Sequence, residues 1–317
     1  MNYVGIDISK EKFDVAIEKD RGYEYHQLSN DAKGFQELVV LIDKQEYWCV
    51  MEASGPYYLK LAWYLTQNSI PLSVVNPLVI RRFCQMRLVK AKTDKKDAAM
   101  IASYGKTEKP EAWKAEESYI LELKQMQAFL DQLNKSRTGY VRQLEAFTQS
   151  PWVSKEVKKG IAKMIRSSEK QIESVEQKME AIIKEHHQQM FKQVQSIPGI
   201  GKKTGLLLVV ISGGFTKFEN AKQLSSYVGL SPRIFESGTS VKARVRICKM
   251  GMSRIRAMLY VCSWSAIKCN KACKELYERL VAKGKSKKLS LIAVANKLLK
   301  QAFAIATKGE FYQENIV

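Results

Sequence analysis

MNYVGIDISK at residues 1–10 and KFDVAIEK at residues 12–19 decide the fold of the first third of the chain. Val4, Ile6 and Ile8 are β-branched and stand two positions apart, which predicts a buried strand in the first segment. The second segment follows a short polar turn, so we expect it to form the antiparallel partner strand.

Two residues inside the first strand differ from an ordinary core pattern. Gly5 has no side chain, so another element can approach the backbone closely there. Asp7 places a carboxylate inside an apolar run, which is costly unless the charge is paired or holds a metal ion. Asp7 is therefore the first candidate ligand of a metal site.

Strand and helix signals alternate through the first 76 residues. Three consecutive strands, then a helix and a further strand, is the order of a ribonuclease-H-like sheet. We expect strands at 2–9, 12–19, 23–28, 47–53 and 71–76, and helices at about 31–45 and 56–68.

Three more acids occupy positions suited to a site. Glu52 lies near the end of the strand YWCVMEAS, where open α/β sheets carry binding residues, although it also fits a plain surface position. Asp94 and Asp97 share the first turn of a helix that Thr93 or Asp94 caps and that runs to about Tyr104. Acids also suit the positive end of a helix dipole, which gives the pair a structural alternative. The surrounding lysines, either charge balance or phosphate clamps, are Lys90, Lys92, Lys95 and Lys96.

Together, Asp7, Glu52, Asp94 and Asp97 form a set of hard oxygen ligands that suits Mg²⁺. Two such ions roughly 3.5–4 Å apart activate the attacking oxygen and stabilise the leaving oxygen in phosphodiester cleavage. Because carboxylates that are packed together repel, a cation is needed between them. The four acids therefore predict a site for two Mg²⁺ ions.

Composition limits the class of protein. The 317 residues, 45% of them hydrophobic, suffice for two domains or for one domain with a long insertion. His26, His186 and His187 are too few for a Ser-His-Asp triad, a zinc hydrolase or an HxH nuclease. No apolar run reaches the length of a membrane span and the N-terminus enters a strand directly, so we expect a cytoplasmic protein. Without a CxxC pair, the cysteines are expected to be reduced and unligated: Cys49, Cys84, Cys248, Cys262, Cys269 and Cys273.

The net charge of +20 is concentrated in the last third of the chain. Residues 1–115 carry 17 basic and 15 acidic side chains, residues 116–190 carry 12 and 11, and residues 191–317 carry 23 and 6. We predict these three segments to be the domains. A basic field of this kind attracts polyanions, most commonly nucleic acid, with an acidic membrane surface as the alternative.

Residues 116–190 show heptad periodicity on both sides of Pro151. The pattern predicts an antiparallel coiled-coil hairpin, which acts as a dimerisation arm or, alternatively, as an intramolecular spacer. The first run, which only Arg137 interrupts, is Leu123, Met126, Leu130, Leu133, Arg137, Tyr140, Leu144 and Phe147; the second is Ile161, Met164, Ser168, Ile172, Val175, Met179 and Ile182.

The sequence SIPGIGKKTGLLLVV at residues 196–210 is typical of a helix-hairpin-helix motif. Gly199 and Gly201 would let backbone N–H groups face a phosphate at the start of the next helix, where Lys202 and Lys203 add positive charge. Many copies of this motif serve only as packing units, which is the alternative.

A polar loop, ESGTS, lies in the basic segment 223–256. Ser237 and Gly238 predict a turn with an exposed hydroxyl. A serine can attack a phosphodiester where arginines neutralise the developing charge, but the residues alone favour a polar turn with a DNA-facing flank. The cations that we predict to bind nucleic acid are Lys202, Lys203, Arg233, Lys242, Arg244, Arg246, Lys249, Arg254 and Arg256. Residues 253–308 are expected to be helices of the same domain.

These motifs together resemble one transposase family. GIDISK, VMEASGPYY, KTDKKDAAMIA, SIPGIGKKTG, GLSPRIFESG and KMGMSRIR follow the family order over nearly the whole chain. The family is that of the DEDD insertion-sequence transposases, the "one-ten" insertion-sequence family, which also includes the Piv pilin-gene invertase.

The resemblance implies a RuvC-like N-terminal domain in which Asp7, Glu52, Asp94 and Asp97 bind Mg²⁺. It also implies a mainly helical C-terminal transposase domain with Ser237 as the nucleophile. The implied chemistry is a DNA break through a covalent phosphoserine, followed by strand exchange, in a homodimer or tetramer whose protomers share the active site. Some members are guided by a bridge RNA from their own element, so an RNA partner and a location at the bacterial nucleoid are implied as well.

Two alternatives stay open. Thr239 and Ser240 follow the serine–glycine pair where many members have a second glycine, so Ser240 is a rival nucleophile, although Ser237 beside Gly238 is favoured. As a competing function, a RuvC-like structure-selective nuclease would use the acids for attack by water while the basic domain only binds DNA. A non-enzymatic nucleic-acid binder is the third possibility.

Overall fold

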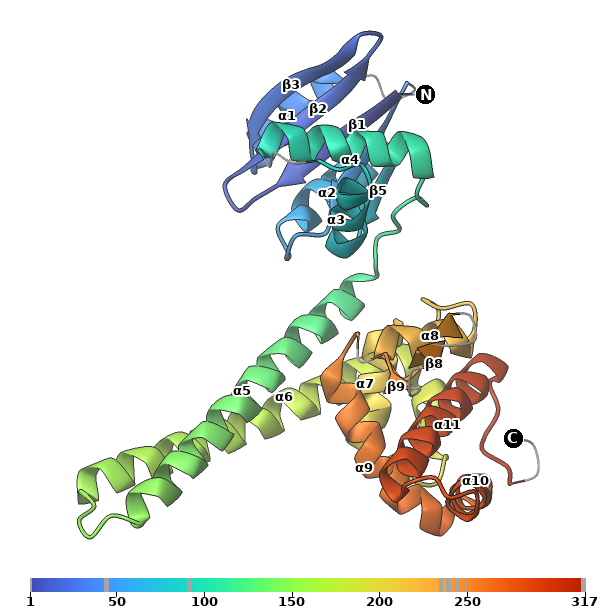
Figure 1. Ribbon diagram of the computed structural model, residues 1–317. Helices are drawn as coiled ribbons and strands as arrows, with labels where there is room; N and C mark the ends of the chain where they lie inside the picture. The colour runs from blue at the N-terminus through green and yellow to red at the C-terminus, as the bar shows by residue number, and fades with distance from the viewer. Residues whose placement is uncertain are drawn as a thin grey trace. The chain divides into compact units, whose positions relative to one another are not determined.

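The computed structural model of the chain describes residues 2–42, 46–89, 93–233, 236–237, 241–242, 246–248 and 250–314. The chain divides into two compact units, Met1–Ala115 and Glu116–Val317. Within the described residues the first unit contains a five-stranded sheet, whereas the second is mainly helical (Figure 1).

The sheet of the first unit has the strand order β3-β2-β1-β4-β5. β1 pairs antiparallel with β2 and parallel with β4, while β3 and β5 form the edges. The predicted α/β organisation is therefore confirmed, including the hairpin formed by the first two strands. The strands are Asn2–Ile8 (β1), Lys12–Lys19 (β2), Gly22–Ser29 (β3), Tyr47–Glu52 (β4) and Leu72–Val75 (β5).

One face of the sheet packs in an apolar core, in which Val4, Ile6 and Ile8 are buried together with Leu38 and Leu61 of the helices α1 and α2. Residues with short polar side chains cap three of the unit's helices, at Asp31, Asn76 and Thr93. The helices of this unit are Ala32–Leu41 (α1), Tyr58–Gln67 (α2), Pro77–Met86 (α3) and Asp94–Glu108 (α4).

Helix α4 lies against the backbone of β1 and β2 on the other face of the sheet. A Cβ atom at Gly5 would lie 2.0 Å from the carbonyl oxygen of Ala98 and 2.4 Å from the amide nitrogen of Ala102. Only glycine permits this approach, which confirms the expectation that another element meets the backbone at Gly5. The contact places the first turn of α4 above the C-terminal end of β1.

The second unit begins with two long helices, α5 (Ser118–Thr148) and α6 (Lys155–Gln195), which pack side by side around Pro151. Leu123 and Leu130 of α5 are buried, as are Ile172 and Met179 of α6, and the far half of the hairpin extends away from the other helices of the unit (Figure 1). The helical hairpin agrees with the heptad pattern. Supercoiling of its two helices stays a prediction.

Helix α6 is interrupted once, at His187, whose φ of −140° and ψ of 33° are not helical. The hydroxyl of Tyr119, in the first turn of α5, lies 2.8 Å from Nε2 of His187, and its ring stacks on His186 with 3.9 Å between centroids. Burial lowers the pKa of His187. The base of the hairpin is thus braced by aromatic contacts at the point where α6 changes direction.

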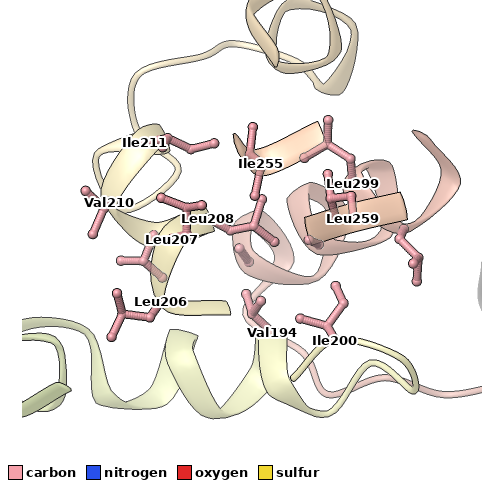
Figure 2. Packing of buried hydrophobic residues seen from close by; sticks show 14 of the residues in the cluster. Val194, Ile200, Leu206, Leu207, Leu208, Val210, Ile211, Ile255, Leu259 and Leu299 are labelled. Carbon is pink, nitrogen blue, oxygen red and sulfur yellow. The ribbon is translucent and has the colours of Figure 1, made fainter. Parts of the chain in front are cut away.

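The remaining helices surround one core (Figure 2). Leu208 of α7, Leu259 of α9 and Leu299 of α11 are fully buried there, next to Val194 from the end of α6. The expectation of helices over 253–308 is confirmed. The helices are Lys202–Ser212 (α7), Ala221–Val228 (α8), Ser253–Cys269 (α9), Lys271–Ala282 (α10) and Lys287–Lys308 (α11).

Helix α11 corrects one expectation, because by length and composition it could cross a membrane. Of its most apolar 18-residue window, 61% is buried in the second unit. A core helix of this size meets the same criteria as a membrane span.

Four short strands connect α8 to α9: β6 (Pro232–Arg233) pairs with β9 (Arg246–Ile247), and β7 (Glu236–Ser237) pairs with β8 (Val241–Lys242). All six cysteines are free thiols.

Candidate active site and nucleic-acid interface

Acidic residues line the face of the sheet that α4 covers. Asp7 of β1 stands directly opposite Asp14 of β2, and the side chains of opposed residues point to the same face. In the parallel pair β1–β4, Ile6 aligns with Met51, so Glu52 comes next to Asp7 at the strand ends. Three carboxylates from three adjacent strands thus form one row.

The first turn of α4 supplies the other two acids, Asp94 and Asp97. The Oγ1 atom of Thr93 caps this turn by accepting from the amide of Lys96 at 3.3 Å. Because Gly5 brings Ala98 down onto β1, the adjacent Asp97 is held over the row. The structure therefore places all four sequence-predicted acids in one region.

Their proximity is expressed in the pKa of Asp7, which rises from 3.8 to about 6. Burial is the largest cause, followed by repulsion from Asp97, Glu52, Asp94 and Asp14, in that order. A carboxyl group that is buried beside other acids binds either a proton or a metal cation more readily than an isolated one does.

Two contacts involve the outer acids, Glu52 and Asp94. The hydroxyl of Ser54 donates to Oε1 of Glu52 at 2.9 Å, in the turn directly after β4. Lys12 Nζ lies 3.8 Å from Oδ2 of Asp94, and both side chains are largely exposed. A single exposed lysine offsets little of the negative charge of five carboxylates.

The donor set fits a divalent cation that prefers oxygen ligands. In the part of the chain that the structure describes, no three carboxylates converge tightly enough to enclose an ion as they stand. Ion binding would therefore have to draw them together. The acids lie on rigid elements, two strands and one capped helix, which limits that movement to side-chain rotation.

Asp14 is the acid that the sequence analysis missed. It is 5% exposed and its Oδ1 accepts a hydrogen bond from Nε2 of Gln27, on β3, at 3.0 Å. The signal was present in KFDVAIEK, where Asp14 interrupts an apolar run as Asp7 does in its own strand.

Ser237 belongs to β7, where it pairs with Val241. The turn between β7 and β8, which contains Gly238, Thr239 and Ser240, lies outside the described residues. Its role as nucleophile stays a prediction.

The lysines of the helix-hairpin-helix motif contact acids of the same chain. Lys202 forms an ion pair with Glu180, and Lys203 Nζ lies 2.6 Å from Oε1 of Glu176, both acids being on α6. Gly199 faces α9, since a Cβ there would lie 2.7 Å from that of Ala266. These contacts favour the packing alternative for this motif, and a phosphate would have to compete with two carboxylates.

Two of the predicted arginines also have partners within the chain. Arg254 pairs with Asp131 of α5, and burial lowers its pKa. Arg256 donates to the carbonyl oxygen of Val228 at 2.9 Å. Arg233, Lys242 and Arg246 lie on the short strands β6, β8 and β9, whereas Arg244 and Lys249, like Lys90 and Lys92, lie outside the described residues.

Comparison with known proteins matches the two halves of the chain to transposases. A family described as "Transposase", of the DEDD type, matches residues 4–150, which include every acid of the sheet face. A second, described as "Transposase IS116/IS110/IS902 family", matches residues 192–278, which include Ser237 and the basic segment. The class that the fold and the acids define is thus that of insertion-sequence transposases.

Relatives extend this similarity to full length. The pilin gene-inverting proteins of Moraxella lacunata and Moraxella bovis are both 31% identical to this chain, over 326 and 329 residues, covering 99% of it and 98% of each relative. A transposase for insertion sequence element IS1111A from Coxiella burnetii is 23% identical over 98% of the chain and 91% of its own length. The chain belongs to the IS110 family of transposases.

Proposed function

We propose that this chain is a DNA recombinase that cuts and rejoins strands with a metal-binding acid tetrad and a serine nucleophile. The observation that carries the proposal is the placement of Glu52, Asp94 and Asp97 near the half-buried Asp7, whose pKa rises to about 6 through burial and then through repulsion from these acids. Transposases act on DNA, and the net charge of +17 over residues 191–317 suits a polyanionic substrate.

In this proposal Asp7, Glu52, Asp94 and Asp97 hold Mg²⁺, for which their oxygen donors fit. Bound Mg²⁺ would stabilise negative charge on the phosphate and on the leaving oxygen. Glu52 is fixed for this task by the hydroxyl of Ser54, and the acids of α4 are fixed by the Thr93 cap and by the contact at Gly5. The strand order β3-β2-β1-β4-β5 supports a RuvC-like assignment of the first unit.

Ser237 supplies the nucleophile. Its hydroxyl oxygen attacks the phosphorus of a DNA phosphodiester and loses its proton, while the bond to one DNA oxygen breaks and that strand leaves as a hydroxyl. A hydroxyl of another strand then attacks the phosphoserine, which restores the Ser237 hydroxyl and joins the strands. The predicted cations Arg233, Lys242 and Arg246 lie on the strands next to this hairpin and would balance the developing charge.

The partners in this proposal are element and target DNA, a guide RNA and further copies of the chain. The acids belong to one compact unit and Ser237 to the other, so a composite site can draw them from different protomers. The helical hairpin of α5 and α6 is the candidate coiled-coil arm for that assembly. The site of action would be the bacterial nucleoid in the cytoplasm.

A covalent-trapping assay tests the chemistry. Purified protein is incubated with Mg²⁺, labelled element-end DNA and RNA transcribed from the flank of the element, and then run on a denaturing gel. We expect a labelled protein–DNA band that is lost in Ser237→Ala and in Asp94→Ala and is retained in Ser240→Ala. Cleaved DNA without an adduct would contradict the serine role and support attack by water. An adduct that persists in Ser237→Ala but not in Ser240→Ala would move the nucleophile to Ser240.

A further inference from the structure

The near-neutral hairpin is electrostatically divided. Its net charge of +1 over residues 116–190 combines two opposite halves. The far half, residues 135–170, carries nine basic and three acidic side chains, whereas the remainder of the segment carries three basic and eight acidic ones. Segment totals hide this division, because the two halves cancel.

One face of α6 carries the division along its length. Lys159, Lys163, Arg166 and Lys170 recur at helical spacing and fall within about 60° of one another around the axis. Farther along the helix the same face carries Glu173 and Glu180 instead. The buried seam toward α5 lies on the opposite side, at positions such as Ile172 and Met179.

The acidic part of this face already has its complement. Glu180 pairs with Lys202 of α7 and with Lys184 of α6, and the neighbouring Glu176 pairs with Lys203 of α7. A cavity of about 290 Å³ is enclosed there between α5, α6, α7 and α9. This end of the hairpin is therefore an internal interface.

The basic part has no such complement. All four side chains are exposed, and they line a surface groove on α6. Of the nine basic side chains in the far half, only Arg137 forms an ion pair, with Glu169 at 3.8 Å, as far as the described residues show. Like charges at this spacing repel one another and destabilise the helix, and a bound anion would relieve this repulsion.

We propose that the row Lys159, Lys163, Arg166 and Lys170, here called the α6 basic stripe, docks the phosphate backbone of a DNA duplex. The stripe spans 11 residues, about 16 Å of helix, which corresponds to about five phosphates of one strand at 3.4 Å each. Lysine and arginine contacts of this kind fix the position of the duplex without reading its sequence. DNA is the occupant favoured here because it is the substrate of the transposase class; the inference needs neither the serine chemistry nor the metal.

Binding to a labelled 30-bp duplex without Mg²⁺, followed by fluorescence anisotropy over a range of salt concentrations, tests this proposal. The variant Lys159→Gln/Lys163→Gln/Arg166→Gln/Lys170→Gln should flatten the slope of log affinity against log salt by about 3–4, and lower the affinity about 30- to 100-fold near 100 mM salt. The variant Lys159→Arg/Lys163→Arg/Lys170→Arg keeps the charge and should bind as the unmodified chain does.

The matched control removes the same charge from exposed positions in the turn after α10 and at the start of α11, by Lys283→Gln/Lys285→Gln/Lys287→Gln/Lys288→Gln. An equal loss in this control would overturn the proposal, because bulk charge would then explain binding. Loss of binding to an RNA duplex of equal length with DNA binding intact would overturn it in favour of RNA. A lower sedimenting mass with DNA binding intact would overturn it in favour of a contact between copies. Circular dichroism checks that the stripe variant stays helical.

Discussion

The molecule contains two clusters of carboxylates that differ in what faces them. On the sheet of the first unit, Asp7 and Asp14 stand opposite each other, and Lys12 forms an exposed ion pair with Asp94 at 3.8 Å. On α6 of the second unit, Glu176 and Glu180 are each engaged by a lysine of α7.

The difference lies in the surroundings of the carboxylates. On α6, the pKa of Glu180 falls below its usual value, because the Lys202 and Lys184 side chains favour the ionised form. On the sheet, burial and then repulsion from the neighbouring acids raise the pKa of Asp7 to about 6. The two carboxyl groups thus shift in opposite directions, and a divalent cation would stabilise the acids of the sheet face.

The largest expected effect comes from disrupting the contact that holds α4 over the acids of the sheet face. Gly5→Ala places a Cβ 2.0 Å from the carbonyl oxygen of Ala98, so α4 must move away from β1. We expect a loss of about 2–4 kcal/mol in the free energy of unfolding, measured by urea denaturation, together with loss of recombination.

Gly160→Ala is the matched control, because a Cβ at this helical position on α6 meets nothing within 4 Å. It should stabilise the protein by up to about 1 kcal/mol. Equal stability of the Gly5→Ala protein and the unmodified chain would show that α4 is not held by this contact.

The next effect is a pH dependence at the acids of the sheet face, opposite in sign to that expected from the lowered pKa of Glu180. The pKa of Asp7 is about 6 in the folded protein against 3.8 in the unfolded chain. Folding is therefore penalised progressively as pH rises from about 4 to 6, and the penalty is complete above pH 6. Without metal, Asp7→Asn should raise the free energy of unfolding by about 1–2 kcal/mol at pH 7.5, allowing for solvent screening, and should have no effect near pH 3.

Urea denaturation at each pH checks this sign, with Asp20→Asn in an exposed turn as control. Added Mg²⁺ should reverse the ranking, because only the unmodified chain keeps the full donor set. A stabilisation by Asp7→Asn that is equal at pH 3 and pH 7.5 would count against repulsion among the acids.

The smallest effect concerns Glu176 and Glu180 of α6. Glu176→Gln/Glu180→Gln removes three partly exposed ion pairs, two with lysines of α7 and one with Lys184, and should cost about 0.5–1 kcal/mol of stability. Freed from their partners, Lys202 and Lys203 become available to phosphate, so DNA affinity should rise about two- to fivefold near 100 mM salt.

Glu275→Gln/Glu278→Gln on α10 changes the net charge equally and is the control. The gain should also vanish when Lys202→Gln/Lys203→Gln is added to the first variant. An equal rise in affinity for both acid pairs would show that these lysines are not masked.

Local patterning predicted much of the first unit. Alternating apolar residues located all five strands, the Thr93 cap located α4, and Gly5 signalled a close backbone approach. The acids followed from the same logic, since Asp7 interrupts an apolar strand and Glu52 ends another. Asp14 follows the same pattern, because it interrupts the apolar run of the second strand.

The partners of the basic residues could not be predicted from local sequence patterns. Lys202 and Lys203 look like phosphate ligands within their own motif, but their partners lie 22 and 27 residues earlier on another helix. Such pairs depend on how α6 and α7 pack, which no local pattern encodes. Likewise, Gly199 suits a phosphate loop in the sequence, whereas its closest neighbour in space is Ala266.

Because α6 is interrupted at His187, a small change of angle there would move the far end of the hairpin by a larger distance. The α6 basic stripe lies 17–28 residues from this pivot, about 25–42 Å along the helix. By simple trigonometry, a change of about 10° at the pivot displaces the stripe by about 4–7 Å, one or two phosphate spacings. The ring of Tyr119 stacks on His186 and its hydroxyl contacts His187, so the aromatic contacts lie at the point where a small change of angle moves the stripe farthest.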